Sequence, residues 1–346
     1  MRRWLEAFEE FAIDVILERR YGKRALALRW FLYWLSWLFT GGVQTRLWLF
    51  RHRLLRSHHP ACLVISIGNL TVGGTGKTTL TLRLARAASA SGRAFAVVCR
   101  DYRPGPSGAG DETLLYRRAL GDAKVFSGRR KVDLAAAAAT SGHDLVLVDD
   151  GFSHWPLARD LDLVLLDAGN PWGGEALLPA GRMREPRRAL QRADWLILTR
   201  VTPPLDPERV SSLRRYAPAA RFAAGRHRVT GVRRLDGADG APPERVRVVT
   251  ATGNPEAVAA SAREAGLEVV ALSAYRDHHW FRTEEAAREK AAAGKAGAAL
   301  LLTAKDAVRW PQPIGPEVHV LEVEWEWLEG GRELEADVLA PPSPEE

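Results

Sequence analysis

Cysteine is scarce in this chain of 346 residues, which contains only Cys62 and Cys99. The two do not form a Cys-x-x-Cys pair or any other spacing typical of metal ligands. We therefore expect no disulfide framework and a reducing compartment. The N-terminus also lacks the layout of a signal peptide, because its first apolar run begins near Ala25, after a helix-like stretch of mixed charge.

Signatures of several other protein classes are missing as well. The chain has no internal repeat, no aromatic-basic RNA motif and no recognition-helix pattern. The adjacent histidines His278 and His279 have no zinc-ligand spacing around them. The net charge of +7 favours anionic partners, which include phosphates, acidic lipid surfaces and nucleic acid. Since the nucleic-acid motifs are absent, we expect no nucleic-acid partner.

Composition places the chain among ordinary globular proteins, with 46% apolar and 26% charged residues. The length predicts two domains. From shifts in composition we expect four segments: N-terminal amphipathic helices over 1–57, a larger α/β domain over 58–222, a linker over 223–244 and a smaller α/β domain over 245–340. The Pro-rich acidic tail from Ala340 to Glu346 is expected to be disordered.

The first 57 residues are rich in tryptophan and in basic side chains. They hold five of the twelve tryptophans, and eleven Lys or Arg against five Asp or Glu. The run from Ala25 to Val43 is apolar apart from Arg29 and a few neutral polar residues. Large apolar side chains recur in this run at a spacing of three to four, as on one helix face: Trp30, Phe31, Trp34, Trp37 and Leu38.

Three arrangements of this run are open. Because Trp and Tyr prefer the headgroup level of a bilayer, we favour a helix that lies in or dips into the membrane interface. Basic residues would then lie near anionic headgroups: Arg46, Arg51, Arg53 and Arg56. The run is also just long enough to span a hydrocarbon core of roughly 30 Å, although Arg29 interrupts it and Gly41-Gly42 would weaken the helix end. The third arrangement is an ordinary helix pair packed on the rest of the protein.

From Ala61 onwards, short apolar runs alternate with helical stretches. Buried strands are predicted at Leu63–Ile67, Ala94–Cys99, Leu145–Val148, Leu163–Leu166 and Trp195–Thr199. Helices are predicted between them at Thr78–Ala90, Asp111–Leu120 and Lys131–Ser141. This alternation predicts an α/β fold, in which a parallel sheet carries helices on both faces.

The same alternation predicts a second, smaller α/β unit towards the C-terminus. Its expected elements are Arg245–Ala251, Pro255–Ala265, Glu268–Leu272, Thr283–Gly294 and Ala299–Thr303. The segment Ala223–Pro243 lies between the two units and is rich in Arg, Gly, Asp and Pro. We expect it to be a connector or a hairpin.

A glycine-rich loop lies where the first predicted strand meets the first predicted helix. After Gly68-Asn69-Leu70 it reads Thr71, Val72, Gly73, Gly74, Thr75, Gly76, Lys77 and Thr78. Glycines let backbone N–H groups converge on phosphate oxygens, and the helix N-terminus adds partial positive charge. Lys77 would reach the β- and γ-phosphates of a nucleotide, and the Thr78 hydroxyl would ligate Mg²⁺. The Walker pattern has a glycine where Thr71 stands, but Gly-Lys-Thr occupies the correct junction, which favours a P-loop over a simple turn.

Acidic residues follow one predicted strand and open one predicted helix. Asp149 and Asp150 end the strand that begins at Leu145, where P-loop proteins place an Asp that holds Mg²⁺. Adjacent carboxylates repel unless a cation or donors lie between them, so we favour a metal site over a strand-end turn. Asp111 and Glu112 open a helix, where acidic residues are routine caps.

Two rival functions also use a P-loop on or near a membrane. A regulatory GTPase needs an Asn-Lys-x-Asp signature after a strand, and the stretch Thr303–Asp306 has the wrong internal spacing. An assembly protein with a degenerate nucleotide site is disfavoured because Lys77, Thr78 and the two aspartates are intact.

Together the motifs resemble the tetraacyldisaccharide 4′-kinases of lipid A synthesis. The matches run in order from about Arg46 to Arg309 and include the whole phosphate loop with its Thr71. The other matching stretches are Gly110-Asp111-Glu112, Asp149-Asp150-Gly151-Phe152 with His154, Leu157–Asp162, Leu178–Gly181, Arg184-Glu185-Pro186, Gly253-Asn254-Pro255, Asp277-His278 and Lys305–Val308.

This resemblance implies an enzyme at the cytoplasmic face of the inner membrane, peripheral or monotopic. It would use ATP and Mg²⁺ to phosphorylate the 4′-hydroxyl of a tetraacyl glucosamine disaccharide 1-phosphate at a surface of anionic lipid. Asp111 would be the catalytic base, paired with His278 from the other predicted domain, and Glu185 would join the Mg²⁺ ligands. Further residues would lie in the substrate cleft: Glu112, His154, Arg184 and Asp277.

The chain departs from the usual pattern of this family at several positions. The family usually reads Arg-Gly-Tyr-Gly where this chain has Arg100-Asp101-Tyr102-Arg103. Thr113 replaces a proline, and Ser153 replaces a glutamine. Asp101 would place a negative charge near the phosphates, which is unfavourable unless Arg100 or Arg103 neutralises it.

Overall fold

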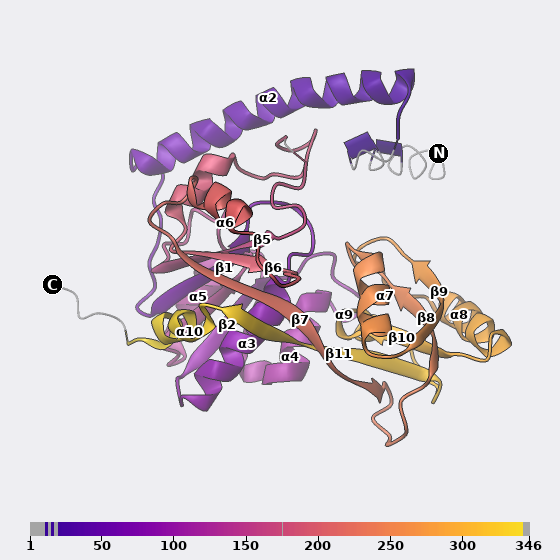
Figure 1. The fold of residues 1–346 in the computed structure, drawn as a ribbon. Helices are drawn as coiled ribbons and strands as arrows, with labels where there is room; N and C mark the ends of the chain where they lie inside the picture. Colours follow the sequence, from indigo (N-terminus) through magenta and orange to yellow (C-terminus); the bar gives the residue numbers. More distant parts are fainter. Residues whose placement is uncertain (1–10, 13–14, 17–19, 175, 342–346) are drawn as a thin grey trace.

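The computed structural model describes residues 11–12, 15–16, 20–174 and 176–341. In Figure 1, a long helix, α2 (Lys23–Arg51), lies along one side of a body built on a single extended sheet. The eleven strands of this sheet have the order β3-β2-β4-β1-β5-β6-β7-β11-β10-β8-β9. Most of the expected C-terminal tail, and Trp4 of the N-terminal segment, lie outside the described residues.

The first six strands form the parallel sheet that the sequence predicts. They are β1 (Leu63–Asn69), β2 (Phe95–Arg100), β3 (Val125–Gly128), β4 (Leu145–Asp149), β5 (Leu161–Asp167) and β6 (Trp195–Thr199). Every pairing among them is parallel. The helices of this half are α3 (Lys77–Ala90), α4 (Asp111–Leu120), α5 (Lys131–Thr140) and α6 (Pro207–Arg214), with short 3₁₀ turns at Asp122–Lys124 and Arg187–Arg192.

Both faces of this sheet are covered, which explains its nearly unbroken apolar strands. On β1, Ile65 and Ile67 pack with Leu80 and Leu84 of α3, whereas Val64 faces the opposite way, towards the cluster that contains Ala135 of α5. Alternate side chains of a strand point to opposite faces, so a sheet buried on both sides requires apolar residues at every position. The α/β prediction with helices on both faces is confirmed.

The smaller α/β unit follows the predicted pattern closely. It contains β8 (Arg245–Thr250), α7 (Pro255–Glu264), β9 (Glu268–Ala274), α8 (Thr283–Lys295), β10 (Ala299–Thr303) and the short helix α9 (Ala304–Ala307). After β11, the helix α10 (Gly331–Leu339) returns to pack against α3 and β7 of the first unit.

Two long strands join the units into one sheet. β7 (Arg221–Arg234) pairs in parallel with β6 over its first residues and then antiparallel with β11 (Val318–Glu329). The first half of 223–243 therefore does connect the units, as a strand, but it is not part of a hairpin, because its antiparallel partner lies about a hundred residues away. The domain boundaries given above stay a prediction.

The helix α2 is longer than the sequence suggests, because it continues through Gly41-Gly42 to Arg51. Its buried residues are only Ala25, Ser36 and Leu47. Large apolar side chains on it are exposed, including Trp30 at 71%, Trp34 at 61% and Trp37 at 80%. Among the described residues, no helix combines the length and apolar character needed to cross a membrane.

Glycine at position 225 of β7 is required by the packing of the two linking strands. A Cβ at Gly225 would lie 2.5 Å from the Trp325 ring and 2.8 Å from the backbone oxygen of Glu326, whereas one at Gly231 of the same strand meets nothing within 4 Å. We expect Gly225→Ala to lower the free energy of unfolding by about 1–3 kcal/mol through overpacking. Urea unfolding of Gly231→Ala is the matched control and should show little change. Equal stability of the two variants would contradict this account.

Candidate active site

The phosphate loop has the backbone geometry of an anion site. It leads from β1 into α3, whose N-terminus has no side-chain cap and no acidic residue in its first turn. The first N–H groups of the helix are therefore open to an anionic ligand. Gly73 and Gly76 have φ values of 117° and 93°, which only glycine adopts without strain. Thr71 instead forms a β-bridge with Met183, so the backbone at this position is extended and needs no glycine.

A second segment, residues 177–184, holds this loop from the side. Val72 N donates to Arg182 O at 2.7 Å, and Arg184 N donates to Leu70 O at 2.9 Å. The same segment contacts α2, because Ser36 Oγ donates to Leu177 O at 2.7 Å. The phosphate loop is thus connected to the exposed aromatic helix through one short stretch of backbone.

The two aspartates at the end of β4 have different surroundings. Asp149 Oδ2 accepts a 2.8 Å hydrogen bond from the Tyr116 hydroxyl, while Asp149 Oδ1 is buried without a hydrogen-bond partner. Burial, and to a smaller extent the negative charge of Glu112, raises the pKa of Asp149 to about 6. Asp150 accepts from Arg184 Nη1 at 2.7 and 2.6 Å and lies 3.6 Å from Lys77 Nζ.

Lys131, which the sequence reasoning missed, fixes the backbone of this pair. Its buried Nζ donates to the carbonyl oxygens of Asp149 at 2.6 Å and Asp150 at 2.7 Å. Burial raises the pKa of Asp150, but Lys77, Arg184 and Lys131 outweigh it and hold that pKa below its usual range. One signal was available: a lysine opens an Ala-rich helix, where the helix dipole favours acidic residues.

A magnesium ion fits these residues in part. No group of three or more His, Cys, Asp or Glu side chains in the described ranges is arranged to hold a metal. Mg²⁺ usually takes only one or two carboxylates and completes its shell with water and substrate phosphates, so a large protein cluster is not needed. The orphaned Asp149 Oδ1 is suited to such a ligand, together with Thr78 at the start of α3.

Two other predicted residues, Glu185 and His154, have contrasting surroundings. Glu185 is buried, and Arg192 Nη1 is 3.0 Å from its Oε2, so its charge is already neutralised by an arginine. His154 has a buried Nε2 without a hydrogen-bond partner, and burial lowers its pKa to about 4, which keeps it neutral at pH 7. The roles of Glu185 as a metal ligand and of His154 in the cleft stay predictions.

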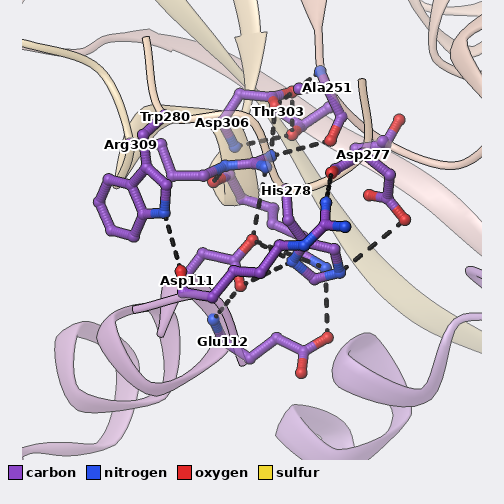
Figure 2. A network of polar contacts seen from close by, with 12 residues as sticks. Asp111, Glu112, Ala251, Asp277, His278, Trp280, Thr303, Asp306 and Arg309 are labelled. Atoms are coloured by element: carbon purple, nitrogen blue, oxygen red, sulfur yellow. Dashed lines mark hydrogen bonds and ion pairs between the residues drawn. The ribbon is translucent and has the colours of Figure 1, made fainter. Parts of the chain in front are cut away.

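Asp111 and His278 meet across the two units, as Figure 2 shows. Asp111 is the first residue of α4 and is 2% exposed. His278 Nδ1 lies 2.9 and 3.1 Å from its two carboxylate oxygens. Burial raises the pKa of Asp111, but the hydrogen bond from His278 and the charges of Lys305 and Arg309 outweigh it and lower the pKa. The sequence-predicted pair is brought together, and the carboxylate is ionised at neutral pH.

The phosphate loop and the His278 loop face each other across Gly253. A Cβ added there would lie 3.6 Å from Gly74 N and 3.7 Å from Asp277 Oδ2. Asp277 Oδ2 is in turn 3.8 Å from His278 Nε2. Nucleotide-binding and proton-accepting groups therefore lie on two sides of one site, which is suited to moving a phosphoryl group onto an acceptor beside Asp111.

Two departures from the family pattern, Asp101 and Thr113, are bonded to each other. The Thr113 hydroxyl donates to Asp101 Oδ1 at 2.7 Å, and Gly110 N donates to the same oxygen at 2.9 Å. In the described part of the chain the partners of the Asp101 carboxylate are these two donors, and no ion pair joins it to Arg100 or Arg103. Asp101 instead supports the start of α4, where the helix dipole favours a negative charge.

This bond predicts an energetic coupling between the two positions. The double-mutant cycle of Asp101→Ala and Thr113→Val should give a coupling of about 1–2 kcal/mol in the free energy of unfolding. Asp122 lies just beyond the far end of α4, so Asp122→Ala combined with Thr113→Val is the control and should be additive. Additive behaviour of the Asp101 pair as well would show that the bond has no energetic weight.

Comparisons with known proteins point to one family. The model of the family described as tetraacyldisaccharide-1-P 4′-kinase matches residues 28–340. The tetraacyldisaccharide 4′-kinase of Anaeromyxobacter sp. strain Fw109-5 is 38% identical over 79% of this chain and 80% of that protein. That of Geobacter metallireducens is 36% identical over 75% of this chain and 81% of that protein.

A solved structure supports the same fold. The "apo" form of LpxK from Aquifex aeolicus in complex with ATP has a TM-score of 0.69 and 22% sequence identity, and the match covers 90% of this chain and all of that one. From the match over most of its length, and from relatives well above 30% identity, the chain belongs to the tetraacyldisaccharide-1-P 4′-kinase family.

Proposed function

We propose that the protein transfers the γ-phosphate of ATP to the 4′-hydroxyl of a tetraacylated disaccharide 1-phosphate. The observation that carries this proposal is the Asp111–His278 pair, whose loop approaches the phosphate loop across Gly253. Family membership makes the chain a kinase. ATP is the nucleotide bound by the solved LpxK of the same fold.

The rival GTPase function has no support in the geometry. The stretch Thr303–Asp306, which comes nearest to a guanine signature, folds into the short helix α9. Asp306 is fully buried, and its carboxylate accepts bonds from Thr250 and Ala251 of the same unit. A guanine base cannot reach that carboxylate.

Different residues would act on the phosphate donor, ATP, and on the acceptor hydroxyl. The amides of the phosphate loop and Lys77 would bind and neutralise the phosphate oxygens of ATP. As the acceptor oxygen bonds to the γ-phosphorus and the bond to the ADP oxygen breaks, Asp111 would take the hydroxyl proton. His278 would hold the carboxylate in the orientation seen here. Asp149, Thr78 and the triphosphate would hold Mg²⁺, which supplies further charge neutralisation when bound.

We also propose that α2 is the membrane-facing part of the enzyme, at the cytoplasmic face of the inner membrane. The supporting observation is its row of exposed aromatic side chains, with Trp37 at 80% and Trp30 at 71% exposure. A water-facing helix rarely keeps such a row, whereas the bilayer interface favours it. Arg46 and Arg51 on the same helix would lie near anionic headgroups. The acyl chains of the substrate could then stay in lipid while its sugar enters the site.

Asp111→Asn tests the assignment of the base. The amide keeps the shape of the carboxylate but accepts no proton, so we expect kcat to fall by about 10²–10⁴-fold with the KM for ATP nearly unchanged. The measurement is ATP-dependent gain of one phosphate on the acylated disaccharide by mass spectrometry. Asp122→Asn, at an exposed carboxylate beyond the other end of α4, is the matched control. Activity within about threefold of wild type would remove Asp111 from this role.

Replacing Trp30, Trp34 and Trp37 together by Ser tests the membrane face. We expect binding to phosphatidylglycerol vesicles to weaken by about tenfold or more, since three exposed apolar side chains are lost. Activity towards a detergent-dispersed acceptor should be retained. The same three positions changed to Phe are the control and should keep most of the binding. Unchanged sedimentation of the Ser variant with vesicles would contradict a membrane role for this face.

A further inference from the structure

The motif Lys305-Asp306 has no role in the mechanism above, yet its Asp306 lies at the centre of a buried polar cluster in the second unit. Asp306 is 0% exposed. Its carboxylate accepts hydrogen bonds from Thr250 Oγ1 at 2.8 Å, Ala251 N at 2.9 Å, Thr303 Oγ1 at 2.6 Å and Arg309 Nη2 at 2.6 Å. So many donors fix a buried carboxylate rigidly, and with it everything that is bound to it.

Asp306 holds the guanidinium of Arg309 in one orientation. Arg309 Nη2 donates to Ala251 O at 3.2 Å as well as to Asp306, and its Nε donates to Lys305 O at 3.1 Å. The remaining nitrogen, Nη1, is buried without a hydrogen-bond partner in the described part of the chain and lies 3.5 Å from Asp111 Oδ2. The buried Arg309 guanidinium therefore points one nitrogen, Nη1, towards the carboxylate of the candidate base in the other unit (Figure 2).

Lys305 approaches the same carboxylate from the neighbouring position. Its Nζ lies 3.2 Å from Glu112 Oε1 and 3.8 Å from Asp111 Oδ2, so one ammonium is shared by the two acidic residues that open α4. Burial lowers the pKa of Lys305, but Glu112, Asp111 and Asp277 outweigh it and raise that pKa. Lys305 therefore stays cationic throughout the working pH range.

The electrostatic surroundings of Asp111 are accordingly set from both units. The groups with charged or titratable atoms against its carboxylate are His278 of the loop before α8, Lys305 of α9 and Arg309 just after α9. Glu112, the next residue on its own helix, donates its backbone N–H to Asp111 Oδ1, and its carboxylate pairs with Lys305. A carboxylate at this depth with no cations nearby would take up a proton near neutral pH. His278 bonds the carboxylate through its Nδ1, and Lys305 and Arg309 add positive charge at 3.8 and 3.5 Å from Asp111 Oδ2.

We propose that Lys305 and Arg309, the latter held in place by Asp306, are positioning residues that set the charge and the orientation of the Asp111 carboxylate. They act through Asp111 and need not touch the substrate, and the proposal rests on the role of Asp111 given above. The stretch that comes nearest to a guanine signature is therefore the part of the second unit that contacts and orients the Asp111 carboxylate.

The direction of the expected effect follows from linkage. The pKa of Asp111 is lowered in the folded protein, so its ionised form stabilises the fold above the unfolded pKa, and this contribution is lost as pH falls through the folded pKa. Removing the Lys305 charge raises the folded pKa. The acid limb of kcat/KM should then move to higher pH, with a loss on the order of tenfold at acid pH that shrinks at alkaline pH.

Lys305→Met is the main test, with two separate readouts. Carbon-13 labelling of aspartate, with Asp111→Asn to assign the signal, reports the titration of the Asp111 carboxyl directly, and the lipid kinase assay reports the pH profile. Lys305→Arg should restore both towards wild type because it keeps the charge. Lys290→Met is the matched control, since it removes a lysine 3.4 Å from Glu317 in the same unit but far from Asp111 in the polar network. Lys305→Gln is a second neutral variant.

The outcomes separate this inference from the proposed function. A higher titration midpoint of Asp111 in Lys305→Met, absent in Lys290→Met and reversed in Lys305→Arg, supports the inference. An unchanged midpoint in folded Lys305→Met and Lys305→Gln overturns it. If the midpoint rises while the acid limb of kcat/KM stays in place, the inference stands and the role of Asp111 as the base fails instead.

Discussion

The whole site depends on burying the Asp111 carboxylate away from water without protonating it. Asp111 is 2% exposed, and an uncompensated carboxylate at that depth would cost several kcal/mol or become protonated. The compensation comes from His278, Lys305 and Arg309, all of which belong to the unit that follows β7. The two units must therefore be held in a fixed relation. The long antiparallel pair β7–β11 provides that relation, because it makes the two parallel sheets into one.

The nucleotide side of the site is held in place mainly by backbone hydrogen bonds, whereas Asp111 is held mainly by charged side chains. The phosphate loop is paired edge to edge with residues 182–184, and the backbone of Asp149 and Asp150 is fixed by Lys131 beneath it. Asp150 has a φ of 53°, a strained value for a residue with a side chain, and the lysine and Arg184 together hold it there. Preorganisation of this kind means that little rearrangement is needed when charge develops on a transferred phosphate.

Local pattern predicted the fold well, and contacts between distant segments account for what it missed. The strands of the first unit were predictable because each is buried on both faces and reads as an unbroken apolar run. β7 and β11 were missed although they alternate Arg or Glu with apolar residues, because each pairs with a strand about a hundred residues away and no local turn signal links them. Asp111 and His278 were identified by family resemblance, since a helix-opening aspartate is otherwise an ordinary cap. Lys131 opens a helix and Lys305 lies in a stretch that matches the family, but neither signal assigned a role to Lys131, Lys305 or Arg309, because the role depends on which carboxylate or carbonyl each one faces.

The separation of the two halves of the site along the chain has a consequence for the fate of ATP in water. The loop that grips the triphosphate is completed early, by β1, α3 and β4, whereas the groups that orient Asp111 arrive only with the last third of the sequence. Because β7 and β11 fix the second unit against the first, a solvent molecule near bound nucleotide but away from Asp111 would meet no aligned proton acceptor. Hydrolysis of ATP by this site would therefore require a water molecule in the place of the acceptor hydroxyl, beside Asp111.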